Sequence, residues 1–292
     1  MISITGASGK LGRAVAYELA QRADPAQVTL GTRTPASIDD LRAMGFNVAV
    51  ADFERPSTLQ EAFGGAESVL LICGHGNNAT RVRQHRNAID AARSVGASRV
   101  LYTSFINPCV DSLFPFAWVH EATENYARSS GLRCTFLRNN HYAENLEAAL
   151  ADARKTGVLA LPGAHGKVAY IARGDVAAAS AGALALDDGR TVAEITGNAA
   201  LDLFEVAELA SHAWGMKVTA REMSAAEYAG LLTERGLPGF VVEAQVGLRL
   251  AAGAGEYARV TRDAEQLAGR PVHELATYLK AFAVPDSVPK GS

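Results

Sequence analysis

The sequence predicts an α/β fold with a doubly wound parallel sheet and a smaller, mainly helical C-terminal lobe. Three observations indicate this class. Short apolar segments rich in Val, Ile and Leu alternate with segments of helical periodicity up to about residue 140, a glycine-rich segment follows the first of them directly, and mainly helical patterns come afterwards. With 292 residues, 48% of them hydrophobic, the chain can bury such a core.

Six strands and five helices are expected in the first part of the chain. Continuous apolar runs are typical of strands that are buried on both faces of a parallel sheet. The predicted strands are residues 2–5, 28–32, 48–52, 68–73, 99–104 and 134–138. The predicted helices are residues 9–22, 37–44, 56–63, 77–95 and 116–129. Right-handed crossovers then give the strand order 3-2-1-4-5-6.

The regular alternation ends after about residue 140. Helical patterns follow at residues 141–155, 202–214, 225–235, 240–251 and 263–267, and strand patterns at residues 167–171 and 192–196. Three parts are therefore predicted. They are a first domain of residues 1–140, a C-terminal lobe of residues 141–284 that shares strands with the main sheet, and a flexible tail of residues 285–292.

Composition and charge exclude several classes of partner. The formal net charge is −3 and no long run of like charges occurs, so neither nucleic acids nor membrane surfaces are expected partners. Cys73, Cys109 and Cys134 are too few and too widely spaced for a disulfide framework or a zinc site. We expect no signal peptide, and no apolar run reaches the roughly eighteen residues that a membrane span needs. We expect a cytoplasmic protein without a metal site, with a small molecule and a second copy in a homodimer as candidate partners.

A glycine-rich loop joins the first predicted strand to the first helix. Gly6 permits a tight turn, Gly9 lets the backbone approach a pyrophosphate, and Gly12 lets the helix pack on the strand. The loop residues predicted to bind a dinucleotide are Thr5, Gly6, Ser8, Gly9, Lys10, Leu11 and Gly12. A plain turn and helix cap would also use glycine, but the strand, the spacing and the helix together favour a Rossmann fold, with the phosphates at the helix N-terminus.

The residue after the second predicted strand indicates which dinucleotide is bound. NAD enzymes place an acidic residue there, whereas NADP enzymes place an arginine. This chain has Arg33, whose planar guanidinium can bind the 2′-phosphate, with Lys10 adding charge nearby. NADPH is therefore the expected cofactor, and the alternative is that Arg33 is a solvated loop residue. Asp52 and Phe53 would border the adenine, unless Asp52 only caps the strand end.

Five segments give the chain a resemblance to a known family. They are residues 4–12 (ITGASGKLG), 84–87 (QHRN), 102–104 (YTS), 120–124 (HEATE) and 136–139 (FLRN). In these segments the chain resembles the NmrA-like group of atypical short-chain dehydrogenases, and the similarity extends over nearly the whole chain. Within that group it is similar to the type 2 NAD(P)H:quinone oxidoreductases and the triphenylmethane reductases.

The resemblance implies a protein of two lobes, with NADPH at the carboxyl ends of the strands and the substrate between the lobes. It implies hydride transfer from NADPH to a quinone, an aromatic ketone or a similar conjugated molecule. It implies that Ile72, Cys73 and Gly74 line the cofactor ribose, with Thr103 among the cofactor-binding residues. It also implies that the nicotinamide is surrounded by the segment Asn139, Asn140, His141 and Tyr142.

Three candidate catalytic residues follow. His120 occupies the position where related reductases have a lysine, and its ordinary pKa of about 6.5 would suit proton donation near neutral pH. Ser104 ends the fifth predicted strand and could bind a substrate oxygen, and Tyr142 could stack on the nicotinamide or the substrate. For each residue a structural role is the alternative, and the core is the expected place of Tyr102. A loop histidine, His75, is a further candidate at the substrate entrance.

Two other functions remain open. A redox-sensing regulator would bind NADP(H) without turnover, as some NmrA-like proteins do, and His120 together with Ser104 favours an enzyme over this. A dedicated biosynthetic ketoreductase would share the fold but reduce one large polycyclic substrate. Turnover of NADPH with simple quinones distinguishes both from the main hypothesis.

Overall fold

The main sheet of the computed structural model, which describes residues 1–74 and 76–283, has seven parallel strands. Their order is β3-β2-β1-β4-β5-β6-β8, so the predicted order is confirmed and β8 is added beside β6. The strands are β1 (Ile2–Ile4), β2 (Val28–Thr32), β3 (Asn47–Val50), β4 (Ser68–Leu71), β5 (Arg99–Phe105), β6 (Arg133–Asn139) and β8 (Val192–Ile195). His75 and the predicted tail lie outside the described residues.

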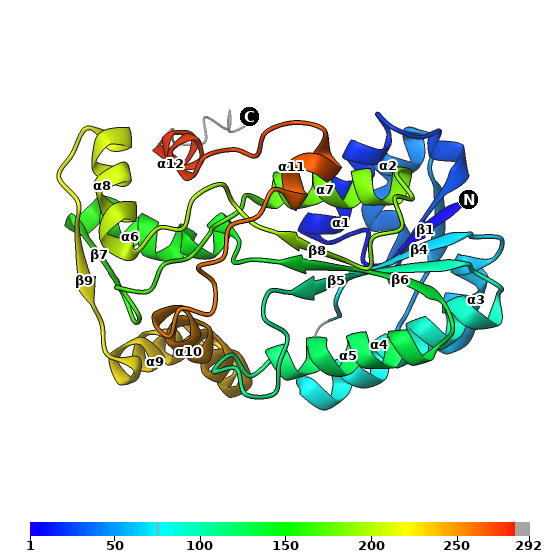
Figure 1. Cartoon of the computed structure of the whole chain (residues 1–292), viewed down its shortest axis with the longest axis horizontal. Coiled ribbons are helices and arrows are strands. Elements are labelled where there is room, and N and C mark those ends of the chain that lie inside the picture. The colour runs from blue at the N-terminus through cyan, green and yellow to red at the C-terminus, as the bar shows by residue number, and fades with distance from the viewer. Residues whose placement is uncertain (75, 284–292) are drawn as a thin grey trace. The chain divides into compact units, whose positions relative to one another are not determined.

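Helices cover both faces of this sheet (Figure 1), as crossover connections in a doubly wound fold require. Helices α3, α4 and α5 lie on one face, and α1, α7 and α11 on the other. The helical elements around the sheet are α1 (Lys10–Leu19), η1 (Pro25–Gln27), η2 (Pro35–Ile38), α2 (Asp39–Ala43), α3 (Pro56–Phe63), α4 (Asn78–Ser94), α5 (Ala117–Ser129), α7 (Arg173–Ala185) and α11 (Asp263–Ala268).

Two compact units make up the chain, and each is built from three segments. The first unit contains Met1–Asn139, Arg173–Ile195 and Thr261–Pro271, and therefore the whole main sheet. The second contains Asn140–Ala172, Thr196–Val260 and the described part of Val272–Ser292. The chain thus crosses between the units several times, whereas the sequence patterns suggest two continuous domains.

The second unit is mainly helical. Its elements are η3 (Ala143–Leu146), α6 (Glu147–Thr156), β7 (Val158–Leu161), α8 (Leu203–Trp214), β9 (Thr219–Glu222), α9 (Ala225–Glu234), α10 (Gly239–Gly253) and α12 (Leu275–Ala283). β7 and β9 pair in parallel as a small second sheet. A capping box formed by Asp202 and Glu205 starts α8, and Gly157 ends α6 with a φ of 74°.

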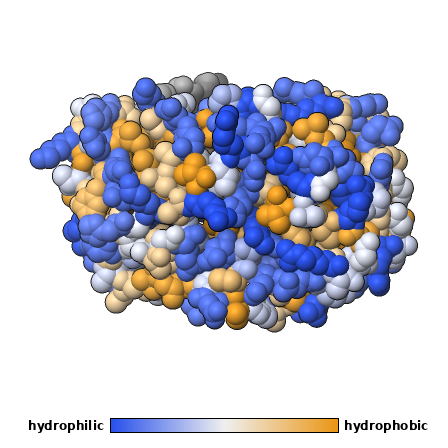
Figure 2. Space-filling view, in the orientation of Figure 1, coloured by the Kyte–Doolittle hydropathy of each residue, from blue (hydrophilic) through white to orange (hydrophobic). Residues whose placement is uncertain are grey.

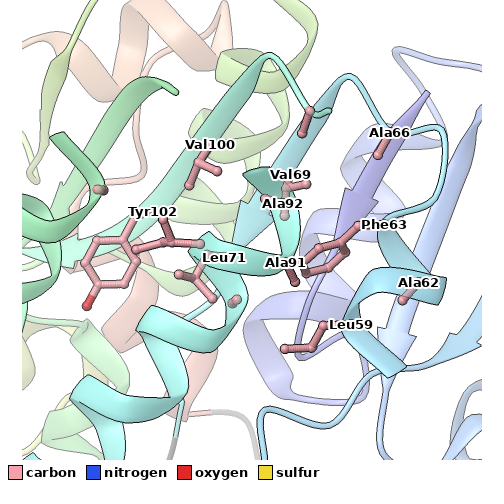
Figure 3. Packing of buried hydrophobic residues seen from close by; sticks show 14 of the residues in the cluster. Leu59, Ala62, Phe63, Ala66, Val69, Leu71, Ala91, Ala92, Val100 and Tyr102 are labelled. Atoms are coloured by element: carbon pink, nitrogen blue, oxygen red, sulfur yellow. The ribbon is translucent and has the colours of Figure 1, made fainter. Parts of the chain in front are cut away.

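The core beneath the main sheet is apolar and fully buried around β4, β5, α3 and α4. Figure 3 shows Phe63, Val69 and Val100 packed together, with Tyr102 at the edge of the cluster and its hydroxyl pointing away from the other labelled side chains. Tyr102 is 0% exposed. A hydroxyl in such a place needs a hydrogen-bond partner, and the partner defines the site described below.

The predicted strand at residues 167–171 does not form a ladder. Val168 makes an isolated bridge with Leu201, and Ile171 makes another with Tyr142. Since neighbouring residues of the segment pair with different parts of the chain, no continuous strand results. The prediction was wrong because an extended, buried segment has the same sequence pattern as a strand.

The described surface is mixed in polarity. On the face seen in Figure 2, hydrophobic residues lie in small groups among hydrophilic ones. Over residues 1–74 and 76–283, no helix combines the length and the hydropathy that crossing a bilayer requires. Within the same residues no cluster of His, Cys, Asp and Glu could hold a metal ion.

Candidate active site

The loop between β1 and α1 has a shape that only glycines allow at two positions. Gly6 has a φ of 65°, and the N–H of Gly9 donates to its carbonyl at 3.0 Å. A Cβ on Gly12 would lie 2.3 Å from the same carbonyl oxygen and 2.8 Å from the Cα of Ala7. The helix can therefore begin this close to the strand only if residue 12 has no side chain.

The N-terminus of α1 fits the phosphates of a dinucleotide. Its N-cap is Gly9, which has no side chain to accept the first helical N–H groups, and its first turn contains no acidic residue. Those N–H groups and the helix dipole are therefore directed at the space beside the loop. The predicted loop residues thus form a cradle of the kind that an NAD(P)H pyrophosphate needs.

The residues predicted to select the cofactor lie beside this cradle. Thr32, the last residue of β2, donates through Oγ1 to Oγ of Ser8 at 2.9 Å, which ties the end of β2 to the glycine loop. Arg33 follows and is exposed, as is Lys10. Two cations are thus close to the loop and accessible to an anionic ligand.

Asp52 is occupied by its own turn. Its carboxylate accepts from the N–H of Glu54 at 3.0 Å and from Nε of Arg55 at 3.1 Å. The Glu54 N–H first, then Arg55 and the charge of Arg33, lower the pKa of Asp52. These contacts favour the alternative in which Asp52 only caps the end of the strand. Phe53 is partly buried and packs against the core cluster.

Three consecutive N–H groups hold the loop after β4. The N–H of Ile72 donates to Oγ1 of Thr5 at 2.9 Å, and that of Cys73 donates to Oγ1 of Thr103 at 3.0 Å. The N–H of Gly74 donates to Nε2 of His85 at 3.1 Å. Thr5 and Thr103, both predicted near the cofactor, therefore fix the backbone that the resemblance places against its ribose.

His85, on α4, is a neutral histidine with an assignable tautomer. Because Nε2 accepts from Gly74, the ring hydrogen is on Nδ1, which lies 2.8 Å from Oγ1 of Thr123. Thr123 donates to the carbonyl of Val119 at 2.8 Å, so its oxygen accepts from His85. Burial lowers the pKa of His85 to about 3, with a smaller effect of the charge on Arg81.

Tyr102 links this histidine to His120. Its hydroxyl lies 2.8 Å from Nδ1 of His120 and 3.4 Å from Nδ1 of His85. The His85 nitrogen already has a hydrogen, so Tyr102 donates to His120, whose nitrogen is a better acceptor than the nearby sulfur of Cys73. His120 then has its hydrogen on Nε2.

The expectation that His120 titrates near neutral pH is wrong. The residue is 6% exposed, and burial first, then the neighbouring ring of His85 and the positive charge of Arg81, lower its pKa well below the ordinary value. A neutral imidazole is therefore present at pH 7. It can donate a hydrogen bond through Nε2, but it is not an imidazolium acid.

Ser104 is paired with a buried carboxylate. Its Oγ donates to Oε1 of Glu124 at 2.8 Å, and Arg138 binds the same carboxylate through Nε at 2.9 Å and Nη2 at 2.7 Å. Arg128 adds a fourth bond at 2.8 Å. Because the Ser104 hydroxyl already donates to Glu124, its oxygen can only accept a hydrogen bond from a substrate. The cluster also joins α5 to β5 and β6.

The remaining predicted residues divide between the two units. Asn139 ends β6 in the first unit, and its carbonyl accepts from the N–H of Ile106 at 2.9 Å. Asn140 and Tyr142 belong to the second unit. The amide of Asn140 is fully buried, donates to the carbonyl of Tyr257 at 3.0 Å and accepts from the N–H of His141 at 2.7 Å.

Two members of the polar network were not among the predicted site residues. From the sequence, Tyr102 is expected in the core and His85 in a structural role; both are fully buried, and the structure also joins both to the network of His120. A signal was present, because each lies in one of the short segments shared with the resembled family. Polar side chains in a buried strand and on the buried side of a helix need partners.

Comparisons with known proteins agree with this geometry. Quinone oxidoreductase 2 of Escherichia coli K12 is 33% identical over 278 residues, 94% of this chain and 96% of that protein. The E. coli NADPH-dependent quinone oxidoreductase solved with NADPH has a TM-score of 0.90 at 32% identity, covering 96% of this chain and 99% of that one. The triphenylmethane reductase of Citrobacter sp., solved with NADP(H), has a TM-score of 0.88 at 28% identity, covering 97% and 100%.

The resemblance to these reductases and the Rossmann fold are thus confirmed. A family match described as NAD(P)H-binding extends over residues 6–187, from the glycine loop to the turn after α7. That is more than half of the chain and includes the cradle at α1, the loop after β4 and the network around His120. The chain belongs to the NAD(P)H-binding family.

Proposed function

We propose that this protein is an NADPH-dependent reductase that transfers a hydride to a quinone, an aromatic ketone or a similar conjugated acceptor. By its family and its relatives the protein is an NAD(P)H-dependent oxidoreductase. The observation that carries the choice of acceptor is the neutral, buried His120. A site without a strong acid suits acceptors that delocalise the incoming charge.

The cofactor residues proposed from sequence have consistent places. The α1 N-terminus would bind the pyrophosphate, and Arg33 with Lys10 would bind the 2′-phosphate. Ile72, Cys73 and Gly74 would line the ribose on a backbone fixed by Thr5, Thr103 and His85. Bound NADPH supplies the hydride.

His120 would act as a hydrogen-bond donor. The resemblance places it at the position from which the lysine of related reductases faces the nicotinamide. Tyr102 fixes the tautomer, so Nε2–H would be offered to the acceptor oxygen on which negative charge develops. The proton that completes the reduction would come from water, since the pKa of His120 is too low for it to be charged at pH 7.

A short-chain dehydrogenase that reduces isolated ketones uses a tyrosine acid with a lysine. Here Tyr102 has its hydroxyl directed at His120, and burial raises its pKa well above the ordinary value. The hydroxyl of Ser104 donates its hydrogen bond to Glu124. The protein would therefore contribute to hydride transfer by positioning the acceptor and by one oriented hydrogen-bond donor, His120. This favours quinones and extended conjugated carbonyl compounds as acceptors.

NADPH oxidation by the purified protein tests the proposal. We expect turnover with simple quinones and little with isolated aliphatic ketones, and no turnover in Gly9→Val. Binding of NADPH without oxidation by any acceptor would indicate a regulator instead. Oxidation confined to polycyclic ketones would indicate a dedicated ketoreductase. A cytoplasmic location and a homodimer stay predictions.

A further inference from the structure

A buried arginine in the second unit has no acidic partner. Arg249 lies on α10 and is 2% exposed. Its Nη1 donates to the hydroxyl of Tyr170 at 3.5 Å, and its Nη2 donates to the carbonyl of Asn145 at 3.2 Å. Its Nε has no hydrogen-bond partner. Over residues 1–74 and 76–283, no carboxylate forms an ion pair with it.

The side chains around Arg249 do not neutralise it. Burial raises the pKa of Tyr170, so its hydroxyl stays protonated despite the opposing effect of the arginine. Burial and then the charge of Arg249 lower the pKa of His141 well below its ordinary value. A neutral phenol, a neutral imidazole and a carbonyl therefore surround a permanent positive charge.

A lone buried guanidinium destabilises a folded protein. Taking one charge out of water is unfavourable even after relaxation, and neutral acceptors recover only part of the lost solvation. Buried charges in proteins are as a rule paired with an opposite charge. The buried guanidinium of Arg249 therefore destabilises the protein by itself, and a bound anion would offset this by supplying the opposite charge.

Two buried polar atoms without partners belong to this same group of side chains. Nε2 of His141 is buried without a partner, and its ring packs edge-on against Tyr170 with centroids 5.4 Å apart. Each Nη of Arg249 has two hydrogens and makes one bond, so Nε and the adjacent Nη can still donate side by side. That edge matches the two oxygens of a carboxylate.

We propose that Arg249, with Tyr170 and His141, forms a recognition site for the carboxylate of an aromatic small molecule. Arg249 binds the two oxygens, His141 Nε2 lies beside them, and the rings of Tyr170 and His141 pack on the aromatic part of the ligand. The inference rests on the proposed function and narrows it, because it makes carboxylated aromatic acceptors the preferred substrates.

Equilibrium binding to the NADPH-loaded protein tests the site, with benzoate as probe and benzamide as its neutral counterpart at fixed ionic strength. Benzoate should bind at least tenfold more tightly than benzamide, and Arg249→Met should remove this preference. Arg235→Met, which removes an exposed cation of the same unit, is the matched control and should bind as wild type does. Tyr170→Phe should weaken benzoate binding a few-fold and leave benzamide unchanged.

Thermal unfolding separates ligand recognition from a structural role. If Arg249 is kept for a ligand, ligand-free Arg249→Met should melt no lower than wild type, and benzoate should raise the melting temperature of wild type alone. A lower melting temperature in Arg249→Met together with equal binding of benzoate and benzamide to wild type would overturn the proposal. If Arg249→Met does not fold, the wild-type preference and Tyr170→Phe decide.

Parallel assays with a neutral quinone keep the two proposals apart. Benzoate binding without quinone turnover would support the proposed carboxylate site and contradict the proposed reductase function. Quinone turnover without a preference for benzoate over benzamide would support the reductase function and contradict the carboxylate site.

Discussion

At the residue scale, the buried polar groups that connect Gly74 to His120 are matched donor to acceptor. Gly74 donates to His85, His85 to Thr123, and Tyr102 to His120. This order gives His85 and His120 one defined tautomer each, and burial keeps both neutral. The chemistry that follows is hydrogen bonding by a neutral imidazole, as opposed to proton transfer by a charged one.

His120→Ala should therefore lower turnover roughly a hundredfold, the scale for losing one preorganised donor, without changing NADPH affinity. Stopped-flow oxidation of NADPH by a quinone measures the rate, and fluorescence titration measures the affinity. Between pH 6 and 8 the wild-type rate should show no step from His120, because its pKa is far below this range.

Tyr102→Phe should have a smaller effect on turnover, because His120 keeps its position but loses the bond that fixes its tautomer. It should also destabilise the fold by about 1–3 kcal/mol, since Nδ1 of His120 is left buried without a partner. A step near pH 6.5 that disappears in His120→Ala, or equal turnover in all three proteins, would contradict this account.

Arg33 is expected to determine the preference for NADPH over NADH. It is exposed beside the glycine loop, and its charge already acts on Asp52. Arg33→Ala should reduce NADPH affinity by about 1.5–3 kcal/mol, the range for a charge-assisted hydrogen bond, and leave NADH affinity unchanged. Arg42→Ala removes an exposed charge on α2 and serves as the control. An unchanged preference in Arg33→Ala would assign the 2′-phosphate to other residues.

At the scale of the elements, Gly9 and Gly12 in the β1–α1 connection have different roles, which substitutions can distinguish. A Cβ on Gly9 would lie 3.2 Å from the carbonyl oxygen of Gly6, a contact that a small shift relieves, whereas a Cβ on Gly12 would lie 2.3 Å from it. Gly9→Val should stay folded and lose NADPH binding, since its side chain fills the phosphate space. Gly12→Ala should lose about 1–3 kcal/mol of stability or more.

Circular dichroism melts and NADPH titrations measure both effects. Gly174→Ala is a suitable control, because a Cβ there meets nothing within 4 Å. Normal NADPH affinity in a folded Gly9→Val would show that the phosphates bind elsewhere. Normal stability of Gly12→Ala would show that helix and strand are less closely packed than the structure indicates.

Three of the elements that were not predicted, α7, β7 and β9, have sequences without a clear periodic pattern, whereas α12 was missed although its sequence is amphipathic. α7 is buried on nearly all sides, and a Cβ on its Gly182 would lie 1.8 Å from the carbonyl of Leu267, so its alanines and glycine show no polar side. β7 and β9 have four residues each and exist as strands because they pair with each other. Hydrophobic periodicity detects neither a helix buried all round nor so short a pair.

At the scale of the whole molecule, buried histidines should make the fold sensitive to acid. His85, His120 and His141 are neutral in the folded state because burial lowers each pKa below the unfolded value of about 6.5. Below pH 6.5 the unfolded chain binds protons that the folded chain does not. Stability should therefore fall by about 1.4 kcal/mol per pH unit for each histidine as the pH decreases from 6.5.

Urea unfolding at pH 7.5, 6.5, 5.5 and 4.5 measures this loss. His85→Gln should show a shallower decline, because one proton-linked group is removed. His212→Gln changes an exposed histidine and should follow the wild-type curve. A free energy of unfolding that stays constant from pH 6.5 to 5 would mean that these histidines are not held neutral.

The sequence by itself determined the sheet order, the first five crossover helices to within a few residues, and the glycine loop, because each depends on local spacing and on apolar runs. It also contained the resemblance to the reductases. Only the tertiary structure decided the chemistry of the polar residues. The charge of His120 depends on burial and on Tyr102, the role of Ser104 depends on Glu124 twenty positions away, and the lone charge of Arg249 depends on which side chains are absent around it. These properties arise from partners and solvent exclusion, which spacing along the chain does not encode.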